Sequence, residues 1–211
     1  RENAIADHFI DSGVDVLLGG GGLYFPPTRL EALRTKGYEV VRSAEELAST
    51  RASRVFGVFS MDRFPYRLDR TAPGVELVPD LSMMTARAFA LLADEQKGFL
   101  LIVNCRLIDE ASHNNDAGSV LAEMLELDRT LEIVMEAARR DPSLLVIVTS
   151  NHETGGMGMT YQAQPTRWGG PTELERIEGQ RRSFRHVMES LWRREQEGLD
   201  LTPTFVLQEV K

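Results

Sequence analysis

The sequence predicts an α/β fold with a largely parallel sheet, and three observations support this prediction. Short runs of apolar and β-branched residues alternate along the chain with amphipathic segments of helical period. Two of these runs, 99–103 and 144–149, are apolar throughout, as is typical of strands buried on both faces. A strong helix is predicted between them, over 117–140, with one apolar face made of Val120, Leu121, Met124, Leu127, Leu131, Val134 and Met135.

The first part of the chain reads as a helix over 3–12 followed by a strand over 14–18. The glycine run 19–22 comes next and predicts a tight turn, because it lacks the G-x-G-x-x-G spacing and the lysine of nucleotide-binding loops. A helix is expected from Pro26 or Pro27 to Thr35, and Gly37 supplies its stop signal.

The next segments carry equally local signals. Residues 38–41 are a strand candidate, and Ser43 with Glu46 forms a capping box that predicts a short helix over 43–48. A strand follows over 54–60. The proline-containing segment 61–80 is expected to be a loop, and a helix should run from Asp80 to about Asp94.

The character of the chain changes after residue 153. A stretch rich in Gly, Gln and Pro predicts an irregular loop up to Pro171, and a highly charged helix is expected over 172–197. Leu201-Thr-Pro has the pattern of a helix start. We therefore expect one α/β domain over 1–160, with an irregular loop and a charged helical insertion over 161–211 packed on the same domain.

Composition excludes several functional classes. The chain of 211 residues has a net charge of −8 and no basic stripe, which argues against a nucleic-acid partner. Its apolar runs are too short to span a bilayer. Cys105 is the single cysteine, so an internal disulfide is impossible. The chain begins at Arg1, as expected of a processed or excised piece.

Three residues are candidate metal ligands. Asp109 and His113 are four residues apart and directly follow the run 99–103, while His152 directly follows the run 144–149. Sites in α/β folds lie at the carboxyl ends of the strands, so these side chains can converge on a metal ion. The alternative is an ordinary surface pair, since D-x-x-x-H occurs often by chance. The remaining histidines, His8 and His186, are interpreted as solvated surface residues.

Four sequence segments occur in an order that resembles the alkaline phosphatase family. They are SGVDVLLGGGGLYF near the start, PYRLDR at 65–70, FLLIVNCRLIDEASHNND around Asp109 and VIVTSNHETGGMG around His152. The likeness covers residues 10–160. It implies a three-layer α/β/α sandwich with a largely parallel sheet, present here in incomplete form.

The resemblance also implies a site and a reaction. In this family two zinc ions and one magnesium ion surround a serine nucleophile that hydrolyses phosphate monoesters. Asp109 and His113 match two ligands of the water-activating zinc, and His152 matches a ligand of the other zinc. The nucleophile, the first metal-binding aspartate and the phosphate-binding arginine belong to the family's N-terminal half, so no catalytic residue is assigned in this chain. A third zinc ligand, a histidine in a G-H-T-G-like motif, has no match after residue 160.

Two positions depart from the family pattern. Asn104 replaces the magnesium-binding glutamate, and Asn151 replaces an aspartate that binds the second zinc. An amide supplies only a dipole where the family has a charge. The sequence thus predicts part of a metal-dependent phosphatase that is inactive as this chain alone. The alternative is a non-catalytic relative that kept the fold and lost the metals. The resemblance further implies a homodimer and a periplasmic or secreted location.

Overall fold

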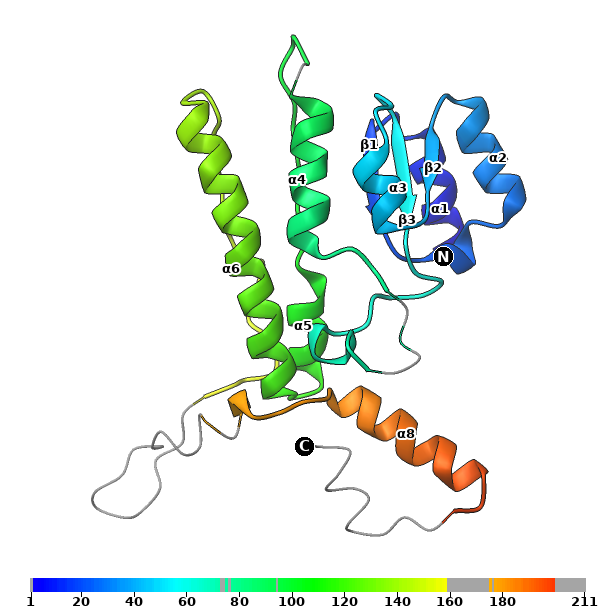
Figure 1. Ribbon diagram of the computed structural model, residues 1–211, viewed down its shortest axis with the longest axis vertical. Coiled ribbons are helices and arrows are strands. Elements are labelled where there is room, and N and C mark those ends of the chain that lie inside the picture. The colour runs from blue at the N-terminus through cyan, green and yellow to red at the C-terminus, as the bar shows by residue number, and fades with distance from the viewer. Residues whose placement is uncertain are drawn as a thin grey trace. The chain divides into compact units, whose positions relative to one another are not determined.

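The computed structural model describes residues 2–72, 75, 77–93, 95–158, 175 and 177–199 (Figure 1). The chain divides into two compact units. The first unit contains residues 1–65, 76–104 and 129–146, and the second contains residues 66–75, 105–128 and 147–211.

The first unit is organised around a parallel sheet of three strands. These are β1 (Val16–Gly19), β2 (Glu39–Val41) and β3 (Val55–Val58), in the order β1-β3-β2. Val55 of β3 lies in register with Val16 of β1 and with Glu39 of β2. The three strands predicted in the first 60 residues are confirmed, and each joins the next through a helical crossover, as parallel pairing requires.

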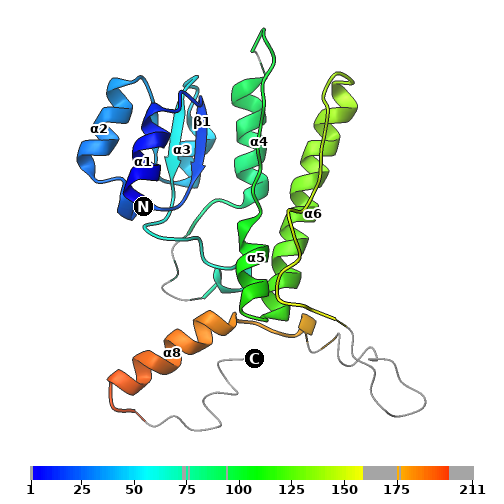
Figure 2. The ribbon, with the colours of Figure 1, turned by 180° about the vertical axis from the view of Figure 1, so that it is seen from behind.

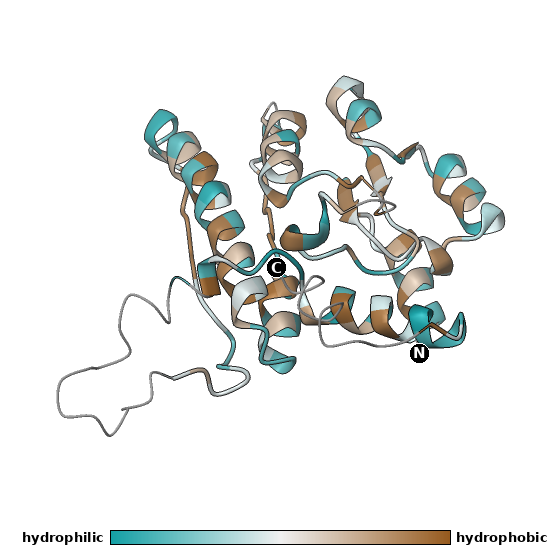
Figure 3. Ribbon diagram, turned by 60° about the horizontal axis from the view of Figure 1, so that its bottom comes forward, coloured by the Kyte–Doolittle hydropathy of each residue, from teal (hydrophilic) through white to brown (hydrophobic). Residues whose placement is uncertain are grey.

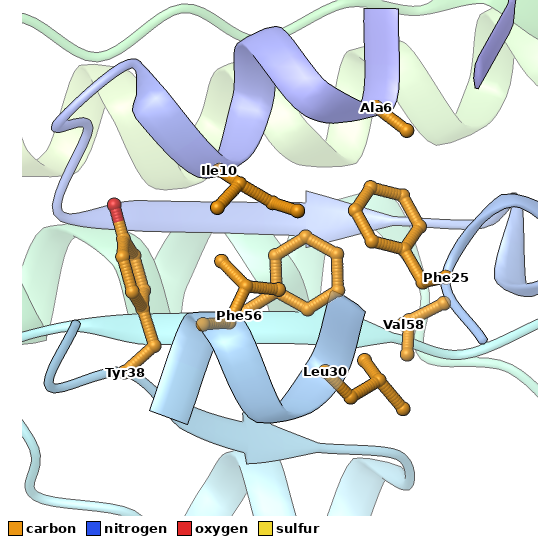
Figure 4. Packing of buried hydrophobic residues seen from close by; sticks show 8 residues of the cluster. Ala6, Ile10, Phe25, Leu30, Tyr38, Phe56 and Val58 are labelled. Atoms are coloured by element: carbon orange, nitrogen blue, oxygen red, sulfur yellow. The ribbon is translucent and has the colours of Figure 1, made fainter. Parts of the chain in front are cut away.

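Helices cover both faces of this sheet. α1 (Glu2–Asp11) and α2 (Pro27–Thr35) pack on one face, while α3 (Ala44–Ser49) and α4 (Leu81–Leu92) contribute to the core on the other. The side chains of β3 alternate between them: Phe56 and Val58 join the first core, and Val55 packs in the second. Figure 4 shows the first core, in which Phe25 lies on Phe56 with ring centroids 4.6 Å apart. The predicted three-layer α/β/α architecture is therefore confirmed in this unit.

Local chemistry explains why these elements begin and end where they do. The Ser43 hydroxyl accepts a hydrogen bond from the Glu46 amide at 3.1 Å, and the Glu46 carboxylate accepts one from the Arg42 amide at 2.6 Å. The first bond satisfies an amide that the first turn of α3 leaves free, and the second holds the residue that precedes the cap. In the glycine run, Gly21 has a φ of 88° and its amide donates to the Asp62 carbonyl at 2.7 Å. The predicted tight turn is confirmed.

Two predicted strands are not formed. The segments 99–103 and 144–149 are extended, but among the described residues neither pairs with the sheet. Leu100 and Ile102 are 84% and 79% exposed, and Leu145 is 80% exposed. The apolar pattern predicted strands buried on both faces, yet an apolar run becomes a strand only where another strand is available to pair with it.

The second unit contains helical segments and connecting loops. They are the 3-10 helix η2 (Arg67–Asp69), α5 (Arg106–His113), the first part of α6 (Ala117–Arg140) and α8 (Phe184–Gln196). The bounds predicted for α6 are confirmed, whereas α5 was not predicted. No helix in the described part of the chain is long and apolar enough to cross a membrane.

The charged helix expected over 172–197 is interrupted: residues 175, 177 and 178 are helical, residues 179–183 are not, and α8 spans Phe184–Gln196. α8 begins at Phe184 because the Ser183 hydroxyl accepts from the amide of His186 at 2.9 Å, as a helix-capping serine does. Residues 179–183 precede this cap and are not helical. The loop predicted up to Pro171 lies largely outside the described residues, and the helix start predicted at Leu201 lies wholly outside them.

The buried side of α6 differs from the prediction. Its first half buries Ser119, Glu123 and Glu126, while Leu121 and Met124 of the predicted apolar face are exposed. The two buried carboxylates have partners in η2: the Arg67 amide donates to Glu123 at 2.7 Å, and the Arg67 guanidinium donates to Glu126 at 2.7 Å. Because paired charges can be buried, the hydrophobic period alone did not identify the packed side.

The buried Asp116 carboxylate joins α6 to α8. One oxygen accepts hydrogen bonds from the Ser119 amide at 3.1 Å and from the Gln180 side chain at 2.6 Å. The other accepts from the Ser119 hydroxyl at 2.9 Å and from the Phe184 amide at 2.6 Å. Asp116 is fully buried, so these four donors replace the water that an ionised carboxylate would otherwise bind.

We expect Asp116→Ala to destabilise the second unit by about 3 kcal/mol or more, because four donors lose their shared acceptor and the two from Ser119 are buried. Chemical denaturation followed by circular dichroism measures this change. Asp128→Ala, at an exposed position of the same helix, is the matched control and should change the free energy of unfolding by less than about 0.5 kcal/mol. Equal stability of the two variants would contradict this account of Asp116.

Candidate metal centre

Asp109 and His113 lie on one side of α5, one turn apart. The Asp109 Oδ1 atom is 3.7 Å from the His113 Nε2 atom, and both side chains reach solvent, with exposed fractions of 46% and 69%. Two ligands of a tetrahedral zinc ion are separated by roughly 3.3 Å, given metal–ligand distances of about 2.0 Å. The pair is therefore spaced so that one ion can contact both atoms after a small side-chain adjustment.

The loop after segment 144–149 brings His152 to the same helix. Gly155 makes this approach possible, since its φ is 85° and a Cβ atom there would collide with the carbonyl oxygen of Ser112 in α5. The Glu153 carboxylate stabilises the turn by accepting a hydrogen bond from the Gly156 amide at 2.7 Å. The Thr-Gly-Gly that follows Glu153 thus places the loop against the end of α5.

Thr154 connects the two groups of candidate ligands. Its hydroxyl donates to the Asp109 Oδ1 atom at 2.8 Å and lies 3.2 Å from the His152 Nδ1 atom. The structure thus brings Asp109, His113 and His152 into one connected set of side chains within the second unit.

The backbone around His152 selects its tautomer. The Nδ1 atom lies 3.0 Å from the carbonyl oxygen of Glu153, and a carbonyl oxygen only accepts hydrogen bonds. Nδ1 therefore carries the proton in the neutral ring, which leaves the lone pair on Nε2. An imidazole held through one nitrogen by a backbone carbonyl presents the other nitrogen as a metal ligand.

Contacts from α8 hold α5 in place. The Arg185 guanidinium donates to Glu110, the neighbour of Asp109, at 3.2 Å and stacks over the Tyr66 ring with its central carbon 4.0 Å from the ring centroid. The Asn114 amide, just after α5, donates to the Tyr66 hydroxyl at 3.2 Å. One planar cation thus fixes the helix that carries two candidate ligands.

The two substituted positions lie apart from this set. Asn151 is exposed and directly precedes His152, and no hydrogen bond to another described side chain is found for it. Asn104 is exposed and belongs to the first unit, whereas the other candidates belong to the second. Its neighbour Cys105 is partly buried, and burial, together with the charges of Glu123 and Glu126, raises the pKa of its thiol. A raised pKa disfavours the reactive thiolate.

The donor set fits a zinc ion in part. A carboxylate oxygen and two imidazole nitrogens are the ligand types that zinc prefers, and the spacing of Asp109 and His113 suits one ion. Within the ranges that the structure describes, no group of three His, Cys, Asp or Glu side chains converges on a single point. Two residues of this chain can thus hold one ion, and water or further protein groups must complete its coordination.

Sequence reasoning identified the ligand candidates but missed three residues that position them. These are Thr154, Gly155 and Asp116. The Thr-Gly-Gly after His152 was a usable signal, because a short hydroxyl side chain beside two glycines is typical of a tight, hydrogen-bonded turn. Asp116 carried no comparable signal, since one of its partners, Phe184, is 68 residues away along the chain.

Comparisons with known proteins agree on one family. The family model described as alkaline phosphatase matches residues 1–183. Alkaline phosphatase 3 of Bacillus subtilis (strain 168) is 32% identical over 163 residues, which cover 73% of this chain and 34% of that protein. The chain therefore spans about a third of the length of this curated relative.

Solved structures give the same result. The crystal structure of Thermus thermophilus alkaline phosphatase is similar with a TM-score of 0.77 and 36% identity, over 90% of this chain and 41% of that chain. A mutant of TAB5 alkaline phosphatase with Mg bound in the M3 site is similar with a TM-score of 0.64 and 25% identity, over 76% of this chain and 47% of that one.

The electrostatics of the second unit lead to a test by pH. Burial raises the pKa of the Glu123 carboxyl, against the opposing hydrogen bond from the Arg67 amide. A raised pKa in the folded state means that the stability contributed by this group is present below its ordinary pKa of 4.5 and is lost as pH rises through the folded value.

We therefore expect Glu123→Gln to stabilise the protein more at pH 8 than at pH 4, because the amide keeps an acceptor for Arg67 without the cost of burying a charge. Urea denaturation at both pH values gives the difference. The matched control is Glu132→Gln, which removes a carboxylate from the exposed side of α6. If Glu123→Gln raised the free energy of unfolding equally at both pH values, ionisation of this carboxyl would not oppose folding.

Proposed function

Because the chain belongs to the alkaline phosphatase family, we propose that it carries part of the metal centre of a hydrolase that cleaves phosphate monoesters. In this proposal Asp109 and His113 are ligands of one zinc ion, and His152 is a ligand of a second zinc ion. The observation that carries the proposal is the connected arrangement of these three side chains through Thr154, with Asp109 and His113 spaced for one ion.

Each residue of the set has a separate role in the proposal. A zinc ion, when bound, supplies Lewis-acid polarisation and lowers the pKa of its water. Asp109 contributes the negative charge that binds the ion, and His113 supplies a neutral nitrogen one helical turn away. Thr154 donates to the Oδ1 atom of Asp109, which is also the atom that lies 3.7 Å from the His113 Nε2 atom, and so orients the carboxylate toward the ion. Glu153 orients the His152 ring through its carbonyl oxygen.

We assign no nucleophile to this chain and propose that the chain alone does not hydrolyse phosphate esters. The family resemblance places the serine nucleophile in a part of the family sequence that the matched motifs do not include. The chain also spans about a third of the curated relative described above, so the reaction belongs to the longer protein architecture. Hydrolysis of p-nitrophenyl phosphate with added zinc and magnesium tests this directly.

A second candidate function is that of a non-catalytic relative that kept the fold and lost the metals. The observation that favours it is the pair of amides, Asn104 and Asn151, at positions where the family has carboxylates. Divalent cations depend on ligand charge, and magnesium depends on it most. In either reading we expect magnesium to bind weakly. A magnesium ion is bound in the similar TAB5 phosphatase variant, so weak magnesium binding would distinguish this chain from that protein.

Two further properties are proposals by family resemblance. We propose that the protein containing this chain forms a homodimer, which analytical ultracentrifugation tests. We also propose a periplasmic or secreted location, which fractionation of the source cells tests. Neither property enters the argument about the metal centre.

The first experiment measures zinc binding by competition with a chromophoric chelator. We expect zinc to bind the parent chain, and Asp109→Asn to weaken binding by about tenfold or more, the size of loss seen even when a neighbour of a ligand is changed. Asp128→Asn removes an exposed carboxylate of the same unit and should leave the affinity unchanged. No zinc binding by the parent chain would favour the non-catalytic alternative, and an unaffected Asp109→Asn variant would exclude this residue as a ligand.

The second experiment restores the missing charges. We expect Asn151→Asp combined with Asn104→Glu to raise zinc or magnesium affinity by about tenfold or more, because each change adds a carboxylate at a family ligand position. Both side chains are exposed, so the variant should fold like the parent. Unchanged affinity would show that ligand charge is not what limits metal binding.

A further inference from the structure

Tyr66 is fully buried in the second unit and contacts both α8 and the end of α5. Arg185 of α8 stacks over its ring, with the central guanidinium carbon 4.0 Å from the ring centroid. The Asn114 side chain, just after α5, donates a hydrogen bond to its hydroxyl at 3.2 Å. Figures 1 and 2 show α5 beside the beginning of α6, with the beginning of α8 close to both. One aromatic side chain thus binds a cation through its ring and an amide through its hydroxyl.

Both contacts of Tyr66 lead to the same side of α5. Arg185 donates to Glu110 at 3.2 Å, and Glu110 and Asn114 are four residues apart, which places them on one side of a helix. The two candidate ligands on α5 each directly precede one of these residues. Successive side chains of an α-helix point about 100° apart. The contacts of Tyr66 therefore fix the rotation of α5 about its axis, and with it the direction of the ligand pair.

The second unit has little apolar packing that would otherwise fix this rotation. In the part of the chain that the structure describes, both hydrophobic clusters of buried residues belong to the first unit. Ala111 is the one buried residue of α5, and the first half of α6 buries the carboxylates of Glu123 and Glu126. Figure 3 shows polar and apolar residues mixed along α6, the long helix at the left of that view. The rotation of α5 thus depends on a few polar and aromatic contacts.

The Arg185 guanidinium is held in this arrangement although one of its donors is not satisfied. Its Nη1 atom binds Glu110, whereas its Nη2 atom is buried and has no hydrogen-bond partner among the described residues. A buried donor without a partner costs free energy, so stability alone does not account for a guanidinium at this place. Its planar shape does, because it stacks on Tyr66 and reaches the carboxylate at the same time. Such local costs are typical of functional sites.

We propose that Tyr66 is a positioning residue of the candidate metal centre. Its ring and hydroxyl set the direction in which Asp109 and His113 leave α5, and so keep both side chains within reach of one zinc ion. A binding site requires its ligands to be held within roughly 0.5 Å of the productive geometry. Arg185 lies outside the residues 1–183 that the family model matches, so the family match does not imply this arrangement. The inference rests on the proposed metal centre.

The test measures the zinc affinity of the full chain and its variants by competition with a chromophoric chelator. Tyr66→Phe keeps the ring that Arg185 contacts and removes the hydroxyl that binds Asn114. We expect zinc affinity to fall by about tenfold or more, as it does when residues that orient metal ligands are changed. Asn114→Ala removes the same hydrogen bond from its other side. The double variant should therefore bind zinc no more weakly than either single variant.

The matched control is Tyr38→Phe in the first unit. It removes a tyrosine hydroxyl that donates to the carbonyl oxygen of Val14 at 2.6 Å, and Tyr38 is also buried. Zinc affinity should stay unchanged in this variant, because Tyr38 belongs to the core of the first unit. A purely structural effect of losing a buried hydroxyl would lower the melting temperature without a selective loss of zinc affinity in Tyr66→Phe. Circular dichroism establishes that each variant is folded.

Arg185→Lys tests the ring contact separately. Lysine keeps the positive charge but has no planar group to stack on Tyr66, so zinc affinity should again fall by about tenfold or more. Hydrogen exchange of the zinc-free chain gives a second measurement that needs no metal. The amides of residues 110–114 should exchange faster in Tyr66→Phe and in Arg185→Lys than in the parent, whereas those of residues 120–126 in α6 should not.

The metal centre and the inference can fail separately. If the parent chain binds no zinc, the proposed metal centre is wrong and the inference is overturned with it. If the parent binds zinc and Tyr66→Phe binds it equally well, the inference alone is overturned. An additive loss in the double variant would also contradict it, because the hydroxyl of Tyr66 and the side chain of Asn114 would then act independently.

Discussion

The buried carboxylate of Asp116 is the constraint on which the second unit depends. A single ionised group accepts four hydrogen bonds there, two of them from the beginning of α6 and one from the first amide of α8. Helix N-termini carry partial positive charge, so the carboxylate is stabilised by two helices at once. Since a charge buried without such partners costs several kcal/mol, this arrangement permits few alternatives for the relative orientation of α6 and α8.

The orientation of α8 in turn determines that of the candidate metal centre. With Phe184 fixed by Asp116 and Ser183 fixed by Asp69, Arg185 points toward α5 and binds Glu110. This contact also fixes the position of Asp109, because Asp109 is the neighbour of Glu110 on α5. The candidate ligands are therefore positioned by residues more than sixty positions apart along the chain, through the carboxylates of Asp69 and Asp116 and the guanidinium of Arg185.

Within the candidate centre, the orientation of the ligands favours metal binding, whereas the loss of two carboxylates disfavours it. The His152 ring is oriented by a backbone carbonyl and Asp109 by Thr154, so the cost of arranging these two ligands is already met by the fold. In the proposed assignment, the zinc site formed by Asp109 and His113 keeps its carboxylate. The zinc site that contains His152 has the amide of Asn151 where the family has a carboxylate. The loss of affinity should then be uneven, and greatest for the ions that depend on Asn104 and Asn151.

The sequence predicted the helices and strands of residues 2–60 well because their signals are local. A capping serine, a proline pair and a glycine with positive φ each act within a few residues, and β1, β2 and β3 find their partners within this chain. The packed side of α6 was predicted incorrectly because Glu123 and Glu126 are buried with Arg67, a tertiary pairing that hydrophobic period cannot reveal. Asp109, His113 and His152 could be chosen as candidates from their positions after apolar runs, but Thr154 and Arg185 required the structure.

The failure of the two strand predictions concerns the candidate site as well as the fold. Five apolar side chains of these segments, Leu100, Ile102, Leu145, Ile147 and Val148, are exposed, so the apolar pattern that predicted two buried strands is not satisfied by packing within the described residues. These segments also lead directly into the candidate ligands: Asp109 lies six residues after Val103, and His152 lies three residues after Thr149. The two apolar runs thus indicated where the candidate ligands follow in the sequence, although neither run forms a strand among the described residues.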